Sequence, residues 1–227
     1  MSALAIPTTM DQVTPAWLTA ALRESGVLST ATVTSIEKVI IGTGVGILGE
    51  LARVTPTYDR AEAGAPKTLV VKIPTADPGG RGIAQMLGFY EKEARFYMDM
   101  AADCAVGAPK CYYTAMNPEK VEYIILMEDL SALRIGDQVV GCTVDEARLI
   151  SRNLARFHAQ WWDSPQLDAL GWIPGMDSPI QALVVGAYLL ANLSATLWTC
   201  RRPRDWRFLL VIPLVRSEEH TSEIQSQ

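Results

Sequence analysis

The sequence predicts an α+β fold: a five-stranded antiparallel sheet with one packed helix, followed by the beginning of a helical region. Three observations predict it. Between residues 32 and 128, short runs rich in Val, Ile and Thr are separated by turns that contain glycine or proline, as in strands joined by short connections. One intervening run has apolar residues three and four positions apart. A longer run with helical periodicity begins at residue 143.

Composition limits the classes of protein that the chain can belong to. It has 227 residues, 49% hydrophobic and 20% charged, which is ordinary for a soluble globular protein with a sizeable core. A net charge of −5 argues against nucleic acid or an anionic membrane as the main partner. The four cysteines are scattered and no secretory signal precedes the first helix, so we expect reduced thiols and a cytoplasmic location.

The first helix has clear start and stop signals. Thr14 is suited to cap it, Pro15 to occupy its first position, and Gly26 to follow its last turn. Its apolar face combines Trp17 with Leu18, Ala21 and Leu22. Five strands are then expected at residues 32–41, 48–55 (stopped by Pro56), 68–74, 110–116 and 121–128.

The third strand ends in a lysine, Lys72, and is closed by Pro74. An ammonium group in a buried strand is costly unless an anion faces it. The alternative is a lysine whose head merely reaches solvent at the strand end. A glycine-rich turn upstream and a helix glutamate, Glu93, downstream favour an ATP site of the kinase type.

Residues 75–82 are expected to form a loop, and residues 83–102 one helix. Glu93 lies on the same stripe as the aromatic residues of that helix, so it needs a cationic partner. The stripe consists of Phe89, Glu93, Phe96, Tyr97 and Met100.

The glycine pattern Gly44-x-Gly46-x-x-Gly49 also fits a dinucleotide-binding fingerprint. That fingerprint requires a helix directly after the turn. Here the next residues alternate and are stopped by Pro56. We therefore interpret the turn as part of a β-hairpin.

Residues 143–162 predict a helix with a capping box, formed by Thr143 and Glu146. We interpret His158 as a core histidine of this helix rather than a catalytic one. The expected buried face consists of Leu149, Ile150, Leu154, Phe157, His158 and Trp161.

Taken in order, these motifs resemble the aminoglycoside-phosphotransferase-like small-molecule kinases, in particular their ecdysteroid-kinase-like and choline-kinase-like branch. The resemblance extends over residues 11–165. Its motifs are Thr14-Pro15-Ala16-Trp17-Leu18, Ile41-Gly42-Thr43-Gly44, Val70-Val71-Lys72, Glu93-Ala94-Arg95-Phe96-Tyr97, Met127-Glu128-Asp129-Leu130 and the run from Leu154 to Trp162.

The resemblance implies a protein-kinase-like fold with ATP and magnesium between two lobes. Lys72 would hold the α- and β-phosphates, and Glu93 would orient it. The backbone of the turn would cover the phosphates, and the end of the fifth strand would be the hinge that binds adenine. The implied turn residues are Gly42, Gly44 and Gly46, and the implied hinge residues are Met127, Glu128 and Leu130. The partners would be a nucleotide and a small-molecule alcohol.

The chain departs from the family in its catalytic loop, where a histidine is followed two positions later by the aspartate base. Neither His158 nor His220 begins such a loop. We interpret Asp205-Trp206, which resembles the metal-binding pair of the family, as a coincidence. No catalytic and no metal-binding residue is therefore assigned, and we expect the chain as written to be inactive.

The C-terminal part suggests a truncated gene product. Residues 216–227 resemble the translation of a sequencing adapter, and residues 191–215 fit no helical period well. We therefore divide the chain into a kinase-like N-terminal lobe (1–133), the start of a helical C-terminal lobe (134–190), a doubtful segment (191–215) and an artefactual tail (216–227). Residues 180–193 predict an apolar helix that is too short to span a membrane, and its uncovered surface predicts self-association.

Two other classes of function stay open. One is a nucleotide-binding module without catalysis, and the other is the product of a broken gene that does not fold stably.

Overall fold

The computed structural model describes residues 4–42, 48–134, 136 and 140–173, with residues 183, 186, 187, 189 and 190. The chain divides into two compact units. The first consists of Met1–Asp137 and Gly141–Trp172, and the second of Gln138–Val140 and Ile173–Gln227. All of the labelled helices and strands belong to the first unit.

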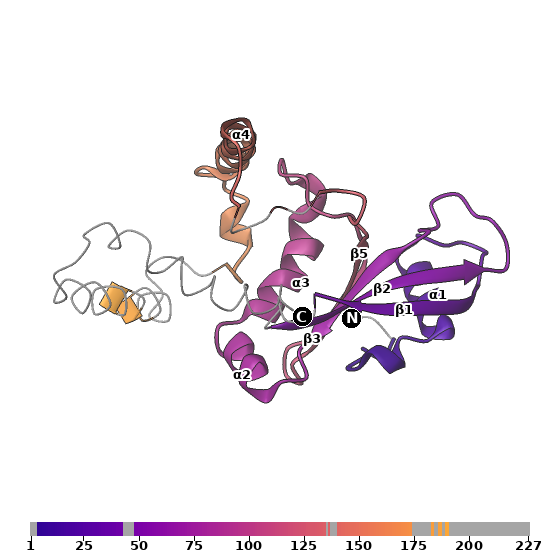
Figure 1. Cartoon of the computed structure of the whole chain (residues 1–227). Coiled ribbons are helices and arrows are strands. Elements are labelled where there is room, and N and C mark those ends of the chain that lie inside the picture. Colours follow the sequence, from indigo (N-terminus) through magenta and orange to yellow (C-terminus); the bar gives the residue numbers. More distant parts are fainter. Residues whose placement is uncertain are drawn as a thin grey trace. The chain divides into compact units, whose positions relative to one another are not determined.

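A five-stranded antiparallel sheet forms the centre of the first unit, as predicted (Figure 1). The spatial order is β1-β2-β3-β5-β4, so the strand that carries Lys72 is in the middle. Strands on both sides of β3 satisfy its backbone groups. The strands are β1 (Val33–Ile41), β2 (Gly49–Tyr58), β3 (Leu69–Pro74), β4 (Cys111–Asn117) and β5 (Glu122–Glu128).

The leading helix, α1 (Pro15–Glu24), covers one face of the sheet. The Thr14 hydroxyl accepts a hydrogen bond from the Trp17 amide, and Pro15 takes the first helical position, as predicted. Gly26 follows the helix with φ = +73°, a conformation that favours glycine. The core on this face includes Leu18, Ala21 and Leu22 of the helix and Ala52, Val54, Leu69, Val71, Ile73, Ala115, Ile124 and Leu126 of the sheet.

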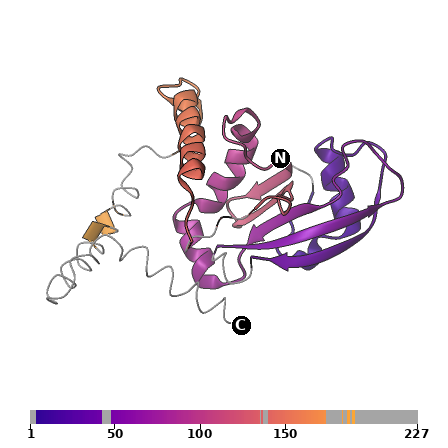
Figure 2. The ribbon, with the colours of Figure 1, turned by 45° about the horizontal axis from the view of Figure 1, so that its top comes forward.

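Two helices, α2 (Pro78–Met86) and α3 (Phe89–Asp99), lie on the other face (Figure 2). The prediction of one helix over residues 83–102 after a loop at 75–82 was wrong. Asp77 caps α2 by accepting a hydrogen bond from the Gly80 amide. Gly88 then adopts φ = +65° and separates α2 from α3. Short 3₁₀ turns occupy Met10–Gln12, Ala101–Asp103 and Leu167–Ala169.

Side chains of the central strands therefore alternate between two covered faces. In β3, Val71 belongs to the core beneath α1, whereas Val70 belongs to the cluster on the side of α3. Helices therefore cover both faces of the sheet, with α1 on one face and α2 and α3 on the other. Lys72 follows Val71 and so points to the α3 side, as strand geometry requires.

Strand β2 continues through Pro56, which was expected to stop it. The register explains why the proline is tolerated. Strand β3 pairs with β2 only as far as Val54, so Pro56 faces a partner strand on one side, at Ile36 of β1. Its missing N–H therefore costs no ladder bond to β3.

Helix α4 (Val144–Trp161) begins with the predicted capping box. The Thr143 hydroxyl accepts from the Glu146 amide, and the Glu146 carboxylate accepts from the Thr143 amide. The predicted burial is wrong, since no residue of α4 is buried. His158 is exposed and is not a core residue. Three apolar side chains of the expected inner face are about half exposed or more: Leu149 58%, Ile150 59% and Leu154 49%.

Polar contacts join the end of α4 to the rest of the first unit. Gln160, near the end of α4, accepts a hydrogen bond from the Ala105 amide and donates one to the Asp103 carbonyl. The apolar stripe of Leu149, Ile150 and Leu154 stays exposed. Within residues 180–193, Leu183, Gly186, Ala187, Leu189 and Leu190 are helical. Residues 191–215 and 216–227 lie outside the described part of the chain.

No helix among the described residues is both long and apolar enough to cross a lipid bilayer.

Candidate functional site

Lys72 and Glu93 form a close ion pair between the sheet and α3. The Lys72 Nζ donates to both carboxylate oxygens of Glu93, at 2.6 Å and 2.7 Å. Their side chains are 22% and 33% exposed. Lys72 is therefore paired rather than merely reaching solvent, and the pairing expected from the sequence is present.

Position and burial both favour the pair. Glu93 lies on the second turn of α3, between the buried residues Tyr90 and Ala94. Two unit charges 4 Å apart attract by about 4 kcal/mol at an effective dielectric of 20, before the cost of desolvation. Removing one partner would leave the other partly buried without a counter-charge, which is the costly state.

The glycine-rich turn begins at the same end of the sheet as Lys72. Ile41 is opposite Leu51, and Leu51 is opposite Lys72 on the next strand. Gly42 follows β1 with φ = +70°, which favours glycine because it has no Cβ. Gly44 and Gly46 lie outside the described residues.

The expected hinge leaves the sheet at the opposite end of β3. Glu128 is opposite Leu69, three residues from Lys72 and therefore about 10 Å along the strand. The Glu128 amide donates to the Lys110 carbonyl at 2.8 Å. Met127 is buried, whereas Leu130 is 38% exposed. Across the described ranges, no hydrogen bond reaches the Leu130 amide, and its carbonyl accepts from Leu133.

Asp129 lies within the hinge motif quoted from the sequence, but no role of its own was expected for it. Its carboxylate accepts from Arg53 Nε at 2.9 Å, and its side chain is only 4% exposed. Burial alone would raise the pKa of Asp129, but hydrogen bonds from Ser131 and Thr68 and the Arg53 charge hold it below the usual range. The contact ties β2 to the hinge. The signal available in the sequence was an arginine in β2, two strands away from β5 in the sheet.

Two tyrosines lie near the ion pair. Tyr90 of α3 and Tyr123 of β5 stack with ring centroids 4.6 Å apart. The Tyr123 hydroxyl is buried and has no hydrogen-bond partner in the described parts of the chain. Burial, with the nearby Glu93 charge, raises the pKa of Tyr123 well above its usual range, so the hydroxyl is neutral. Neither tyrosine was expected to take part in the site.

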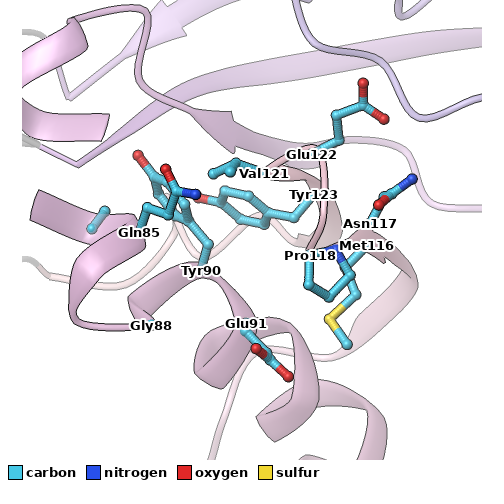
Figure 3. Close-up of a pocket in the computed structure, with 11 residues that line it drawn as sticks. Gln85, Gly88, Tyr90, Glu91, Met116, Asn117, Pro118, Val121, Glu122 and Tyr123 are labelled. Carbon is cyan, nitrogen blue, oxygen red and sulfur yellow. The ribbon is translucent and has the colours of Figure 1, made fainter. Parts of the chain in front are cut away.

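These rings also form a wall of a small pocket between α2, α3 and the β4–β5 turn (Figure 3). Gln85, Tyr90 and Tyr123 come together there, while Glu122 points away from the rings. The pocket has a volume of about 60 Å³. That volume holds only a few water molecules, so the pocket is too small for a nucleotide.

The described residues contain no cluster of metal-ligating side chains. Among them, no group of three or more His, Cys, Asp or Glu side chains is arranged to hold a metal ion. The donor set that the family implies for magnesium is thus not found in this part of the chain.

A kinase-like N-terminal lobe is defined by the antiparallel sheet, by helix α3 on one of its faces and by the Lys72–Glu93 pair that joins them. The model of the ecdysteroid kinase-like family matches residues 44–160, which is more than half of the chain. The chain belongs to the ecdysteroid kinase-like family, and it is a small-molecule kinase-like protein. Searches of curated proteins and of solved structures found no match.

Proposed function

We propose that the chain is part of an ATP-dependent phosphotransferase that acts on a hydroxyl of a small molecule, and that it binds ATP without transferring phosphate in its present form. The observation that carries the proposal is the Lys72–Glu93 pair beside the start of the glycine turn. In phosphoryl transfer, the protein mainly positions the reacting groups and neutralises their charge.

In this proposal Lys72 contacts the α- and β-phosphates, and Glu93 keeps its ammonium group in place. The backbone of the turn at Gly42, Gly44 and Gly46 covers the phosphates. Adenine lies against the end of β5, where Met127 and Glu128 lead into the hinge and the Leu130 amide is available as a donor. About 10 Å along β3 separates this end from Lys72, which leaves room for the ribose.

Magnesium enters the family's reaction as the counter-ion of the phosphates. Because the described residues offer no ligand set for it, no step is assigned to it. The sequence also lacks the histidine-led catalytic loop. Loss of a general base alone typically costs about 10²–10⁴-fold in rate, which supports binding without useful turnover.

The first experiment measures nucleotide binding by the 227-residue chain. A thermal-shift titration with Mg-ATP should give a saturable rise in melting temperature that Lys72→Ala abolishes. Lys67→Ala is the matched control, since Lys67 is an exposed lysine just before β3. A wild-type chain that melts cooperatively but does not respond to ATP would refute the proposal. A chain without any cooperative melt would support the broken gene product instead.

The second experiment separates binding from catalysis. Radiolabelled ATP is offered with amino-sugar, choline-like and sterol alcohols, and Lys72→Met serves as the background. We expect no labelled product above that background. Turnover on any acceptor would contradict the proposed inactivity and would point to catalytic residues in the part of the chain not described here.

A further inference from the structure

Gly49, the first residue of β2, lies against the side chain of Lys72. A Cβ atom placed on Gly49 would be 2.9 Å from Lys72 Cε, closer than real Cβ contacts come. It would also be 3.4 Å from the Ile73 carbonyl and 3.5 Å from the Tyr123 hydroxyl. The end of the lysine chain therefore occupies the space that any other residue at position 49 would fill.

The backbone gives no reason for glycine at this position. The glycines with positive φ among the described residues are Gly26, Gly42, Gly64, Gly88 and Gly141, and Gly49 is not one of them. It is a paired strand residue opposite Pro74. Glycine weakens a strand, so its presence here is explained by the space that Lys72 needs.

The clash also determines what would move. The atom at 2.9 Å belongs to the flexible end of a side chain, whereas the backbone atom at 3.4 Å leaves an acceptable contact. A methyl group at position 49 would therefore displace the Lys72 ammonium before it displaced the sheet. The buried Tyr123 hydroxyl, 3.5 Å from the same Cβ position, is a further neighbour of that methyl group.

We propose that Gly49 is a positioning residue that sets where the Lys72 ammonium lies. For nucleotide binding, this inference rests on the proposed function. For the position of the lysine, it rests only on the contacts above.

The first test needs no nucleotide. The rate at which an N-hydroxysuccinimide ester acetylates Lys72 is measured by mass spectrometry, with exposed Lys67 as the internal reference. An ammonium group held between two carboxylate oxygens reacts slowly, so we expect Lys72 to react several-fold faster in Gly49→Ala. Gly82→Ala is the matched control, because Gly82 is exposed and a Cβ there meets nothing within 4 Å. An unchanged Lys72 rate in Gly49→Ala would overturn the proposal.

A thermal-melt cycle tests the same contact without labelling. Lys72→Ala removes the Cε atom, so Gly49→Ala should have less effect in that background than in the wild type. Equal effects in both backgrounds, or a Gly49→Ala chain that fails to fold, would mean that the methyl group disturbs the sheet rather than the lysine, and would overturn the proposal.

Nucleotide titration then connects the position to function. Gly49→Ala should bind Mg-ATP roughly tenfold more weakly, the scale of one displaced charge-assisted contact, with Gly82→Ala unchanged. If acetylation responds but the wild type binds no nucleotide, the positioning role holds and the proposed function fails. If the wild type binds and Gly49→Ala binds equally well, the positioning role in binding is wrong.

Discussion

At the scale of single residues, the Lys72–Glu93 pair depends on both partners being present. Each side chain is at least two-thirds buried, and each supplies the opposite charge that the other needs. The contact uses both oxygens of the carboxylate, which fixes the direction of the ammonium group as well as its distance.

The first prediction is that Lys72→Met and Glu93→Gln affect ATP binding non-additively. Once one partner has been replaced, replacing the other changes the binding free energy little further. A coupling free energy of about 0.5–3 kcal/mol is therefore expected, as for other residues in contact. The measurement is isothermal titration of the two single variants and the double variant. Strictly additive losses would count against the pairing as a functional unit.

Glu62 makes a second prediction possible, on acid stability. Its carboxylate accepts hydrogen bonds from the amides of Ser29, Thr30 and Ala31, which joins the β2–β3 connection to the α1–β1 connection. These bonds lower the pKa of Glu62 from 4.5 to about 2. Because the folded-state pKa is depressed, this stabilisation is fully present above about pH 4.5 and is lost as the pH falls through 2.

Glu62→Gln should therefore lose stability near neutral pH and show a weaker pH dependence between 4.5 and 2. Urea unfolding at several pH values measures both. Glu37→Gln, which makes the same charge change on an exposed position of β1, is the control. Parallel stability curves for Glu62→Gln and the wild type across that window would show that the carboxylate does not contribute.

At the scale of elements, the end of β5 is held from the side by β2. Arg53 reaches past β3, which lies between the two strands, to the nearly buried carboxylate of Asp129. Because Asp129 also accepts from the Ser131 amide at 3.0 Å, the same carboxylate fixes the start of the hinge.

We expect Asp129→Asn to lower the free energy of unfolding by about 1–3 kcal/mol, the usual cost of leaving a hydrogen-bonded buried group without its charged partner. Asp145→Asn is the control, because its partner Arg148 and Asp145 itself are 65% and 91% exposed. Such a pair contributes about 0–1 kcal/mol. Equal effects of the two substitutions in urea unfolding would show that Asp129 is no more than a surface residue in solution.

At the scale of the whole molecule, apolar surface is left uncovered. In the first unit, the stripe of α4 exposes Leu149, Ile150 and Leu154. In the second unit, Leu183, Leu189 and Leu190 are 72%, 60% and 66% exposed. Contiguous apolar patches above a few hundred Å² are rare on soluble monomers.

The last prediction is that the purified chain self-associates at micromolar concentration. Replacing Leu149, Ile150 and Leu154 together by Gln should reduce the mass measured by light scattering. Replacing Arg148, Arg152 and Arg156 by Gln, on exposed positions of the same helix, should not. A clean monomer for the wild type would contradict the prediction.

The sequence by itself determined the strands, the two capped helices and the identity of the ion pair. These features depend either on residues close together in the sequence or on a buried charge that must have a partner. Strands and helices have fixed periods, and caps such as Thr14 and the Thr143–Glu146 box are read over three or four residues. The pairing of Lys72 with Glu93 could be predicted from the sequence, because a buried cation and a glutamate on an apolar stripe each required a partner.

Only the tertiary structure decided the rest. Helix α2 contains three glycines and has poor intrinsic propensity, yet its Asp77 cap, its buried Ala84 and the Arg81 contact to the Val121 carbonyl hold it against the sheet. The exposed stripe of α4 has the same period as a buried one, because periodicity says which residues share a face but not what covers it. Gly49 needed no special backbone, so its role depends on a lysine more than twenty residues away in the sequence.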